Sequence, residues 1–174
     1  MREHIKRVTT LSLAGVMSAL MLSSPRPILV WNMSASAPLG LYALHRLNHL
    51  RHGDLIAVQP TESQADFLNQ RGFLGQGALL LKHVAALTGQ LACRQDNHIL
   101  IDGRIVATVQ RHDHLGRDLP QWRGCRRLTS REIFLLNAAP DSLDSRYFGP
   151  FHTRSVIGRA TPLWTDDDRN LHQF

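Results

Sequence analysis

Two serines that lie two residues apart, Ser34 and Ser36, begin the segment of this chain whose residue types best suit catalysis. Pro38 and Gly40 follow, so the pattern predicts a strand edge that breaks into a turn and lifts a hydroxyl group out of the sheet. Such a hydroxyl is a suitable nucleophile once a base lies beside it. Serine, proline and glycine also gather in ordinary turns for backbone reasons, so a plain turn stays open as an alternative.

The candidate base is Lys82, because the chain holds 20 lysine and arginine residues and only Lys6 and Lys82 are lysines. Lys82 lies in the apolar run 78–86, which is bounded by Gly77 and Gly89 and suits a buried strand about as well as a helix. Burial can make a lysine neutral and able to take a proton from serine, whereas arginine stays charged. A surface lysine whose stem covers apolar groups is the alternative.

The rest of the chain offers short strand signals that would position these groups. Strands are predicted at 41–44, 55–60, 132–137 and 155–164, with a hairpin inside 91–109 around the turn at Asp102 and Gly103. Residues 61–77 form a polar stretch with three glycines, and 110–131 form a polar, irregular insertion. Turn signals every eight to twelve residues or so, without a long amphipathic helix, predict one mainly β domain.

The N-terminus is basic over residues 1–7 and almost uncharged over 8–22. This run is shorter than the roughly 20 residues of a full span, but Ser23 and Ser24 extend it. Residues 20–24 make a poor cleavage site, so we expect an uncleaved anchor whose basic end stays in the cytoplasm and whose remaining chain lies across the membrane. A cleaved signal peptide and a buried N-terminal helix stay open.

The net charge of +6 comes almost entirely from scattered arginines, with no block longer than Arg126 and Arg127. Charge spread in this way is typical of a solvated surface, so we expect no nucleic-acid partner. Attraction to anionic lipid headgroups is the other interpretation of this charge.

The chain has two cysteines, Cys93 and Cys125, which predict a disulfide across the insertion if the domain lies in an oxidising compartment. Their spacing does not suggest a zinc site, which needs more ligands close by. His112 and His114 are interpreted as incidental surface histidines, so no metal or other cofactor is expected.

Residues 32–42, NMSASAPLGLY, resemble the nucleophile box of the TraF-type conjugal-transfer peptidases, a branch of the type I signal peptidase family. GDLIAVQP, LLLKHVAALTG and DSLDSRYFGP agree with further boxes in the same order, and SVIGRATPLW resembles the end of the branch. The resemblance covers about residues 28–164. It implies a signal-peptidase-like β domain of antiparallel strands over 28–165, in which about 90–131 form a hairpin and insertion. The basic N-terminus and the uncharged run after it predict an anchor over 1–27 before this domain, and the polar end of the chain predicts a flexible tail over 166–174.

The same resemblance implies a role for each matched residue. Ser36 would be the nucleophile and Lys82 the general base. Ser34 matches the hydroxyl that forms the oxyanion hole together with the backbone N–H of Ser36, and Ser142 matches the serine that orients the lysine. Such hydrogen-bond donors, aimed at the charge that develops during the reaction, often give the largest catalytic contribution.

Asp144 matches the aspartate of the family's last box, and an ion pair with Arg146 would support the site. Some residues depart from the pattern of the broader signal peptidases. His83 follows the lysine where arginine is common, Ala37 follows the nucleophile where methionine or isoleucine is usual, and the last box begins NAAPDS. These departures favour the TraF branch and leave each catalytic group in place.

The resemblance therefore implies a serine endopeptidase with a Ser/Lys dyad, anchored in the inner membrane with its domain in the periplasm. Its partner would be a pilin precursor of a conjugative transfer system, and the acyl group would pass to water or to the pilin's own N-terminus. The apolar strands predict small residues near the cleaved bond. A general type I signal peptidase acting on exported preproteins and a non-catalytic envelope scaffold are the alternatives.

Overall fold

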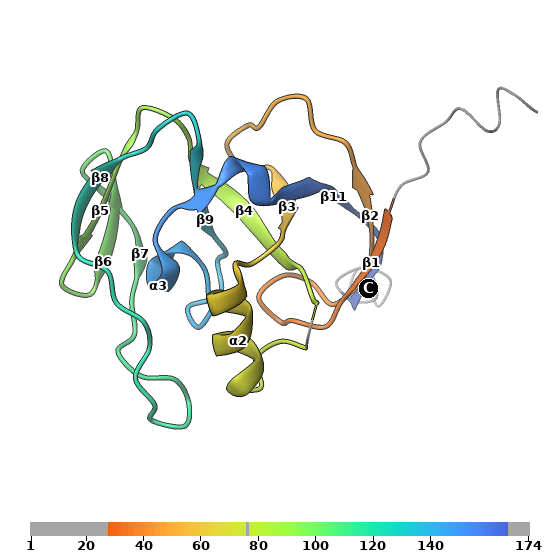
Figure 1. The fold of residues 1–174 in the computed structure, drawn as a ribbon, viewed down its shortest axis with the longest axis horizontal. Helices are drawn as coiled ribbons and strands as arrows, with labels where there is room; N and C mark the ends of the chain where they lie inside the picture. Colours follow the sequence, from red (N-terminus) through yellow and green to blue (C-terminus); the bar gives the residue numbers. More distant parts are fainter. Residues whose placement is uncertain (1–27, 76, 167–174) are drawn as a thin grey trace, which may run out of the picture.

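The computed structural model describes residues 28–75 and 77–166, so the expected membrane anchor and nearly all of the expected tail lie outside the described residues. The strands of this region form two antiparallel sheets (Figure 1). Across the larger sheet the order is β1 (Ile28–Asn32), β2 (Gly40–His45), β11 (Val156–Thr165), β3 (Leu55–Val58), β4 (Leu80–Ala86), β9 (Glu132–Leu136) and β10 (Phe151–His152). The prediction of a mainly β fold is confirmed.

The smaller sheet has the order β7 (Arg104–Thr108), β6 (His98–Ile101), β5 (Leu91–Gln95) and β8 (Gly124–Arg127). It lies at the opposite end of the molecule from β1 (Figure 1). The predicted hairpin is present as β6 and β7, with both Asp102 and Gly103 at positive φ, as a two-residue hairpin turn requires.

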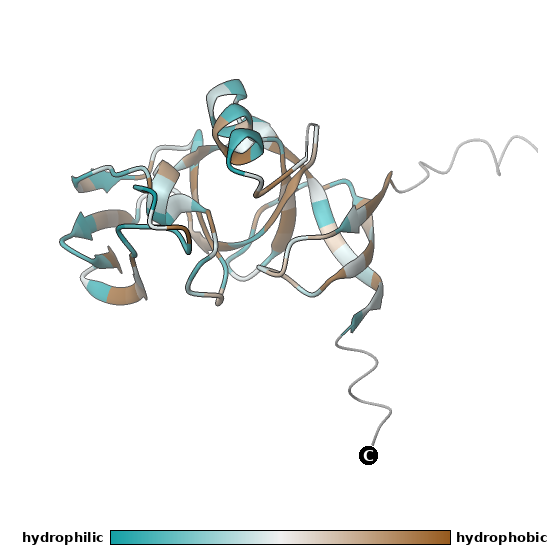
Figure 2. Ribbon diagram, turned by 90° about the horizontal axis from the view of Figure 1, so that it is seen from below, coloured by the Kyte–Doolittle hydropathy of each residue, from teal (hydrophilic) through white to brown (hydrophobic). Residues whose placement is uncertain are grey.

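The main hydrophobic core lies beneath both sheets, and a second, smaller buried cluster around Tyr42, Ala57 and Leu81 belongs to the larger sheet. Ile56, Val84 and Phe134 of the larger sheet belong to the same buried cluster as Ala92 and Ile99 of the smaller one. The hydrophobic stretches of the strands follow the curved middle of the molecule, whereas the small sheet also exposes hydrophilic stretches (Figure 2). Because the core is shared, the small sheet packs on the large one as part of one folded domain.

Strand β4 settles the choice between strand and helix for the apolar run 78–86. It pairs with β3 on one side and with β9 on the other, so both of its edges are hydrogen-bonded inside the sheet. Side chains alternate along a strand, and Leu80, Lys82 and Val84 therefore share one face. Leu80 and Val84 belong to the main core, so Lys82 points into it.

Several elements were not predicted, and two of them lie in stretches that the sequence analysis described as polar. Helix α2 (Glu62–Gln70) lies within the stretch 61–77, for which the sequence analysis predicted only a polar stretch with three glycines. Thr61 caps its N-terminus in a capping box with Gln64, a signal that the sequence carries as TESQ. Strand β8 lies inside the segment 110–131, which was expected to be irregular throughout. All four residues of β8 are exposed, so its sequence shows no alternation of apolar and polar residues that would predict a strand. Its pairing with β5 holds it in the sheet.

Two shorter helices follow β9, namely α3 (Ser145–Phe148) and the 3-10 helix η1 (Thr153–Ser155). Among the described residues, no helix has the length and apolar character needed to cross a membrane.

Candidate active site

The turn between β1 and β2 carries Ser36, and Asn32 at the end of β1 holds it in shape. The Asn32 Nδ2 amide donates hydrogen bonds to the carbonyl oxygens of Ser34, Ala37 and Pro38 at 3.0, 3.1 and 3.0 Å. Its Oδ1 atom accepts one from the Ser34 N–H at 3.1 Å. Since one buried side chain satisfies the polar backbone of the turn, the turn keeps a single conformation with Ser36 at its tip.

Lys82 meets Ser36 and Ser142 at one point. Its Nζ atom donates to Ser36 Oγ at 2.9 Å and to Ser142 Oγ at 2.8 Å. The three residues come from the β1–β2 turn, from strand β4 and from the segment after β9. The structure therefore brings together groups that are 46 and 60 residues apart in the chain.

Burial changes the acidity of this lysine. Only 2% of Lys82 is exposed, and desolvation is the main reason that its pKa falls from 10.5 to about 8. Asp144 and Asp141 oppose this shift by attracting the ammonium, whereas Arg146 adds to it by repulsion. A lysine with a pKa near 8 is neutral in a useful fraction of molecules near neutral pH.

Ser34 lies on the other side of the Ser36 hydroxyl, with 3.0 Å between the two Oγ atoms. Both hydroxyl groups are partly exposed and face the same cavity. A hydroxyl beside the nucleophile can turn toward an oxygen that gains charge on the attacked carbonyl. Ser34 thus lies where its hydroxyl could donate a hydrogen bond to such an oxygen, as its predicted role in an oxyanion hole requires.

Asp144 and Arg146 form a buried ion pair next to this group. Arg146 Nη2 lies 2.9 Å from Asp144 Oδ2, and Arg146 Nε donates to Asp144 Oδ1 at 3.0 Å. Asp144 also caps helix α3 by accepting the Arg146 N–H, while Arg146 donates to the carbonyl oxygens of Pro140 and Asn137. These bonds fix the segment that carries Ser142, because Ser142 lies between the two anchored carbonyls and Asp144.

Asn137 supports the strand that carries Lys82, and the sequence analysis assigned it no role. Its Oδ1 accepts the backbone N–H of His83 at 3.1 Å, and its Nδ2 donates to the carbonyl oxygen of Leu81 at 2.9 Å. These two backbone groups flank Lys82. Asn32 was likewise overlooked, although it opens the segment that resembles the nucleophile box. No signal in a single sequence marks Asn137, because its partners lie on another strand.

A cavity of about 520 Å³ contains the two hydroxyls and the lysine; we call it the Ser36 cavity. Apolar side chains line most of the rest of this cavity. Asp113, His114 and Asp141 add charged or polar groups to the lining. The apolar members are Leu68, Phe73, Leu74, Leu80, Leu119 and Leu143. A second hollow of about 790 Å³ begins at Met33 and Ser34 and continues along β1. The lining residues that the two hollows share are Met33, Ser34, Gly72, Phe73 and Leu74. The Ser36 cavity therefore continues into the second hollow as one groove.

The loop after α2 closes one side of the Ser36 cavity, and the segment after β7 closes another. Arg71 Nη1 donates to the Asp118 carbonyl oxygen at 2.7 Å, and Arg117 Nη2 donates to the Arg71 carbonyl oxygen at 3.3 Å. Arg117 also pairs with Asp113 at 2.7 Å. These bonds join the loop after α2 to the segment between β7 and β8, so the two walls of the cavity hold each other in place.

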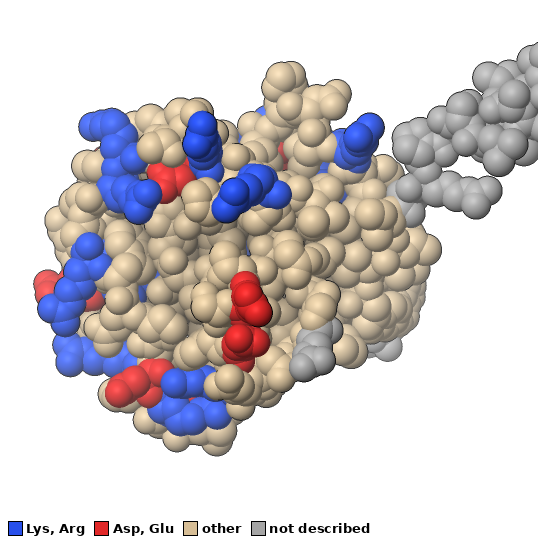
Figure 3. All heavy atoms as spheres, in the orientation of Figure 1, with Lys and Arg blue, Asp and Glu red and all other residues tan. Residues whose placement is uncertain are grey.

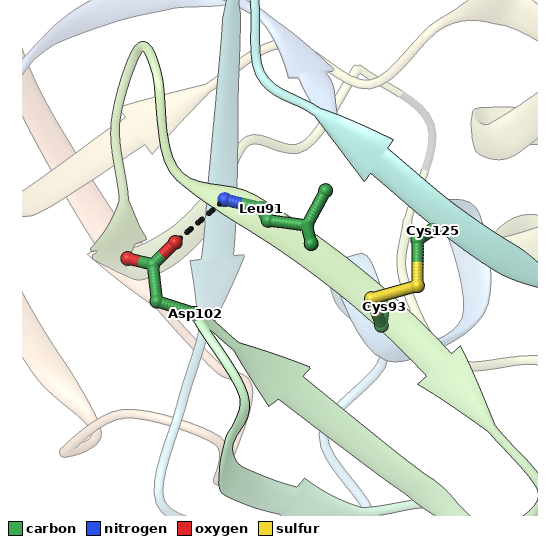
Figure 4. Close-up of a disulfide and its surroundings, with 4 residues drawn as sticks. All are labelled: Leu91, Cys93, Asp102 and Cys125. Atoms are coloured by element: carbon green, nitrogen blue, oxygen red, sulfur yellow. Dashed lines mark hydrogen bonds between the residues drawn. A yellow bond between two sulfur atoms is a disulfide. The ribbon is translucent and has the colours of Figure 1, made fainter.

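Cys93 and Cys125 are joined in a disulfide between β5 and β8 (Figure 4). They lie directly opposite one another in the sheet, and neither lines the Ser36 cavity. The neighbouring turn is fixed by Asp102, whose Oδ1 accepts the Leu91 N–H at 2.8 Å (Figure 4). The disulfide thus belongs to the small sheet and not to the group around Lys82.

His112 and His114, the two histidines of the insertion, have different contact partners. His112 Nε2 lies 3.2 Å from Asp118 Oδ1, and the His114 ring packs edge-on against Phe73. Over residues 28–75 and 77–166, no three His, Cys, Asp or Glu side chains are arranged to hold a metal ion.

The arrangement can carry out acyl transfer. A neutral Lys82 can accept the Ser36 proton across 2.9 Å, which leaves an alkoxide-like nucleophile facing the cavity. Ser142 holds the amine in line, and Asn32 and Asn137 hold the two backbone segments. The geometry and the lowered pKa therefore suit Ser36 Oγ as a nucleophile and Lys82 Nζ as its base.

Comparisons with known proteins identify the family. The family model described as signal peptidase, peptidase S26 matches residues 1–164. A conjugal transfer protein TraF of Agrobacterium fabrum is 35% identical over 148 residues, which cover 78% of this chain and 82% of that protein. One of Agrobacterium tumefaciens is 36% identical over 146 residues, covering 77% and 81%. A crystal structure of a signal peptidase I from Enterococcus faecalis overlaps with a TM-score of 0.40 at 21% identity, covering 66% of this chain and 99% of that one.

Proposed function

The chain belongs to the signal peptidase family, peptidase S26, and we propose that it is a serine endopeptidase that processes a pilin precursor for conjugative plasmid transfer. One observation carries the proposal. The Ser36 hydroxyl lies 2.9 Å from a buried lysine amine whose pKa is lowered to about 8, so a nucleophile and its base are already in contact. The TraF name of the relatives supports the choice of a conjugative substrate.

In acylation, Ser36 Oγ attacks the carbonyl carbon of the scissile peptide bond while its proton moves to Lys82 Nζ. The oxygen of the tetrahedral intermediate then carries the negative charge, and the Ser36 backbone N–H and the Ser34 hydroxyl are the nearest candidate donors for it. When the C–N bond breaks, Lys82 returns the proton to the leaving amine. The products are a free amine and an ester between the acyl group and Ser36.

The ester can then react in two ways. Water attack, with Lys82 again accepting the proton, gives a linear carboxylic acid and free Ser36. Attack by the substrate's own N-terminal amine gives a cyclic peptide bond and also frees Ser36. The second product is lighter than the first by one water, because no water is consumed. Cyclisation is thus proposed as one of the two fates of the ester.

The groove supports an extended substrate with small uncharged residues next to the cleaved bond. Leu80 and Leu143 line the cavity beside Ser36, so a charged side chain there would lose its hydration without gaining a salt bridge from them. Met33 leads from this cavity to the second hollow along β1. A peptide in extended conformation could lie across both.

We also propose that the protein acts at the inner membrane with its domain in the periplasm. The sequence supports this through the uncharged run 8–22 behind a basic N-terminus. The described domain supports it through large exposed hydrophobic residues near the start of β1, including Ile28, Leu29 and Trp31. Trp31 stacks on Trp164 with 5.6 Å between ring centroids, and tryptophan suits the interface between lipid and water.

The test is the intact mass of a pilin precursor that is co-expressed with the full chain. Wild-type protein should shorten the precursor, and Ser36→Ala and Lys82→Ala should leave it uncut. Ser130→Ala, which changes an exposed serine outside the site, is the matched control and should cut normally. A product lighter by one further water would identify cyclisation. Circular dichroism of each variant separates loss of chemistry from loss of folding.

Two outcomes would favour the other interpretations. If Ser36→Ala and Lys82→Ala process the precursor as well as wild type does, the dyad is wrong and a non-catalytic envelope scaffold replaces it. If wild type leaves the pilin precursor intact but releases a reporter preprotein of the general export pathway, the protein is a general signal peptidase.

A further inference from the structure

A separate cavity of about 440 Å³ lies in the small-sheet region, and we propose that it binds a phosphate group. We call it the arginine pocket. Its lining shares no residue with the Ser36 cavity and is polar and charged: Arg94, Asp96, Asn97, Arg111, Gln121 and Arg123. The segment between β7 and β8 separates the two cavities, because Gln110 lines the Ser36 cavity and Arg111 the arginine pocket. The proposed peptidase chemistry gives this second cavity no task.

The proposal rests first on Arg94, because this arginine is buried without a counter-ion. Only 6% of this residue is exposed, and among the described residues it takes part in no ion pair. Its Nη1 atom donates to the carbonyl oxygens of Pro120 at 3.3 Å and Arg146 at 2.9 Å. Those bonds fix the guanidinium in place but leave its charge uncompensated. Buried arginines are rarely found without a paired anion.

The two other arginines increase the positive charge. Arg111 and Arg123 are exposed, and within the described part of the chain neither forms an ion pair. Burial is the main cause that lowers the pKa of Arg94; Tyr147 opposes this shift, and repulsion by Arg123 adds to it. Asp96 is the single carboxylate in the lining. Three cations thus face one anion across one cavity.

The small sheet keeps these like charges together. Arg94 directly follows Cys93 on β5, and Arg123 lies two residues before Cys125 at the start of β8. The disulfide joins those two strands at this point (Figure 4). Because the covalent bond and the strand pairing hold the arginines in place, the fold bears their repulsion even without a ligand. An anion that enters the pocket would relieve it.

The number and type of donors favour phosphate over a carboxylate. An arginine fork binds two oxygens of one phosphate or carboxylate, and a phosphate monoester offers up to two negative charges and three oxygens. The surplus of cations in the pocket matches such a dianion better than it matches a single carboxylate. Asn97 and Gln121 add amide groups to the lining. Figure 3 shows lysine and arginine side chains gathered over this end of the molecule.

A soluble phosphate and a lipid headgroup offer the same chemistry, and the fold favours the soluble source. The small sheet lies at the opposite end of the molecule from β1, where residue 28 enters the domain (Figure 1). A phosphate on a soluble molecule can reach that end freely. The proposal is therefore a phosphate monoester or free phosphate bound in the arginine pocket.

The test uses the full chain in detergent and inorganic phosphate as the probe. Isothermal titration calorimetry at fixed ionic strength should show saturable binding at one site. Arg123→Gln should weaken binding by about tenfold or more, because it removes one charged fork at an exposed position that does not hold the fold. Arg154→Gln, at an exposed arginine on η1 outside the pocket, is the matched control and should bind like wild type.

Several results would overturn the proposal. Phosphate that does not saturate, acetate that binds as tightly as phosphate, or Arg154→Gln that weakens binding as much as Arg123→Gln would each reduce the pocket to general surface charge. Binding to vesicles that contain phosphatidylglycerol, without binding to inorganic phosphate, would assign the site to lipid instead. Peptidase activity has no part in these measurements, so the two proposals can fail separately.

Discussion

Lys82 shows how one residue gains its chemistry from its surroundings. It lies opposite Ile56 in the sheet and shares a face with Leu80 and Val84, so its stem is surrounded by core side chains. Two serine hydroxyls are the hydrogen-bond partners of its amine. The ammonium loses most of its hydration there, and neutral dipoles replace only part of it. A base of this kind exists only because the rest of the fold stabilises it.

The lowered pKa predicts how activity depends on pH. Since the proposed reaction uses neutral Lys82 as its base, kcat/KM should rise as the pH increases through about 8 and then level off. The rate of precursor cleavage by purified full chain between pH 6 and 10 measures this, with the substrate below its KM. A profile that is flat across pH 8, or that falls there, would contradict the assignment of Lys82.

The lowered pKa of Lys82 should also make the stability of the fold depend on pH. Between pH 8 and 10.5 the unfolded state holds the Lys82 proton more tightly than the folded state, so the free energy of unfolding rises with pH over that window. Relative to Lys82→Met, wild type should gain about 3 kcal/mol from the bottom to the top of the window. Urea unfolding of both proteins at pH 8 and pH 10.5 measures the difference, and groups common to both cancel.

At the scale of elements, the turn that carries Ser36 depends on the strand that follows it. Gly40 begins β2 with φ +148, and β2 pairs with both β1 and β11. A Cβ atom at Gly40 would lie 2.1 Å from the Trp164 carbonyl oxygen on β11. Glycine therefore lets the β11 backbone approach closely at the point where the turn re-enters the sheet.

Gly40→Ala should accordingly destabilise the protein by roughly 3 kcal/mol, through a backbone clash and an unfavourable φ. It should also lower activity, because relief of the clash moves the turn that carries Ser36. Gly75→Ala is the matched control, since open space surrounds that position. Urea unfolding of both variants measures the effect. Equal stability of the two variants would mean that β2 and β11 separate without cost.

At the scale of the whole molecule, the small sheet contributes one wall of the site. The segment after β7 returns to the larger sheet, where Leu119 and His114 line the Ser36 cavity and Arg117 contacts the loop after α2. The same small sheet carries the arginine pocket on the other side of that segment. Its integrity therefore affects both cavities, although Lys82 and the turn that carries Ser36 belong to the larger sheet.

The disulfide between Cys93 and Cys125 should stabilise this sheet by closing a loop over a sequence separation of 32. The chain-entropy estimate is about 3–4 kcal/mol for a loop of this size. Reduction should speed amide hydrogen exchange in β5 and β8 more than in β2 and β3. Mass spectrometry with and without reductant measures this, and a Cys93→Ala/Cys125→Ala double variant should no longer respond to reductant. Unchanged exchange in wild type would contradict the prediction.

The sequence by itself determined the class of fold, the hairpin at Asp102 and Gly103 and the order of the catalytic candidates. These features depend on local patterns. Short alternating strands, turn residues and a recognisable segment around Ser36 act within a few residues of one another. The capping box at Thr61 was also local, so helix α2 could have been predicted from it.

Tertiary structure alone decided which side chains meet. Whether the run around Lys82 formed a strand or a helix depended on β3 and β9 pairing with it, and both partners are distant in the chain. The pairing of β4 with β9 placed Asn137 beside the Lys82 backbone, and the pairing of β5 with β6 and β8 put Arg94 in a cavity without a counter-ion. Neither result leaves a local pattern, because burial and contact across a sheet depend on strand order, which no short window of sequence contains.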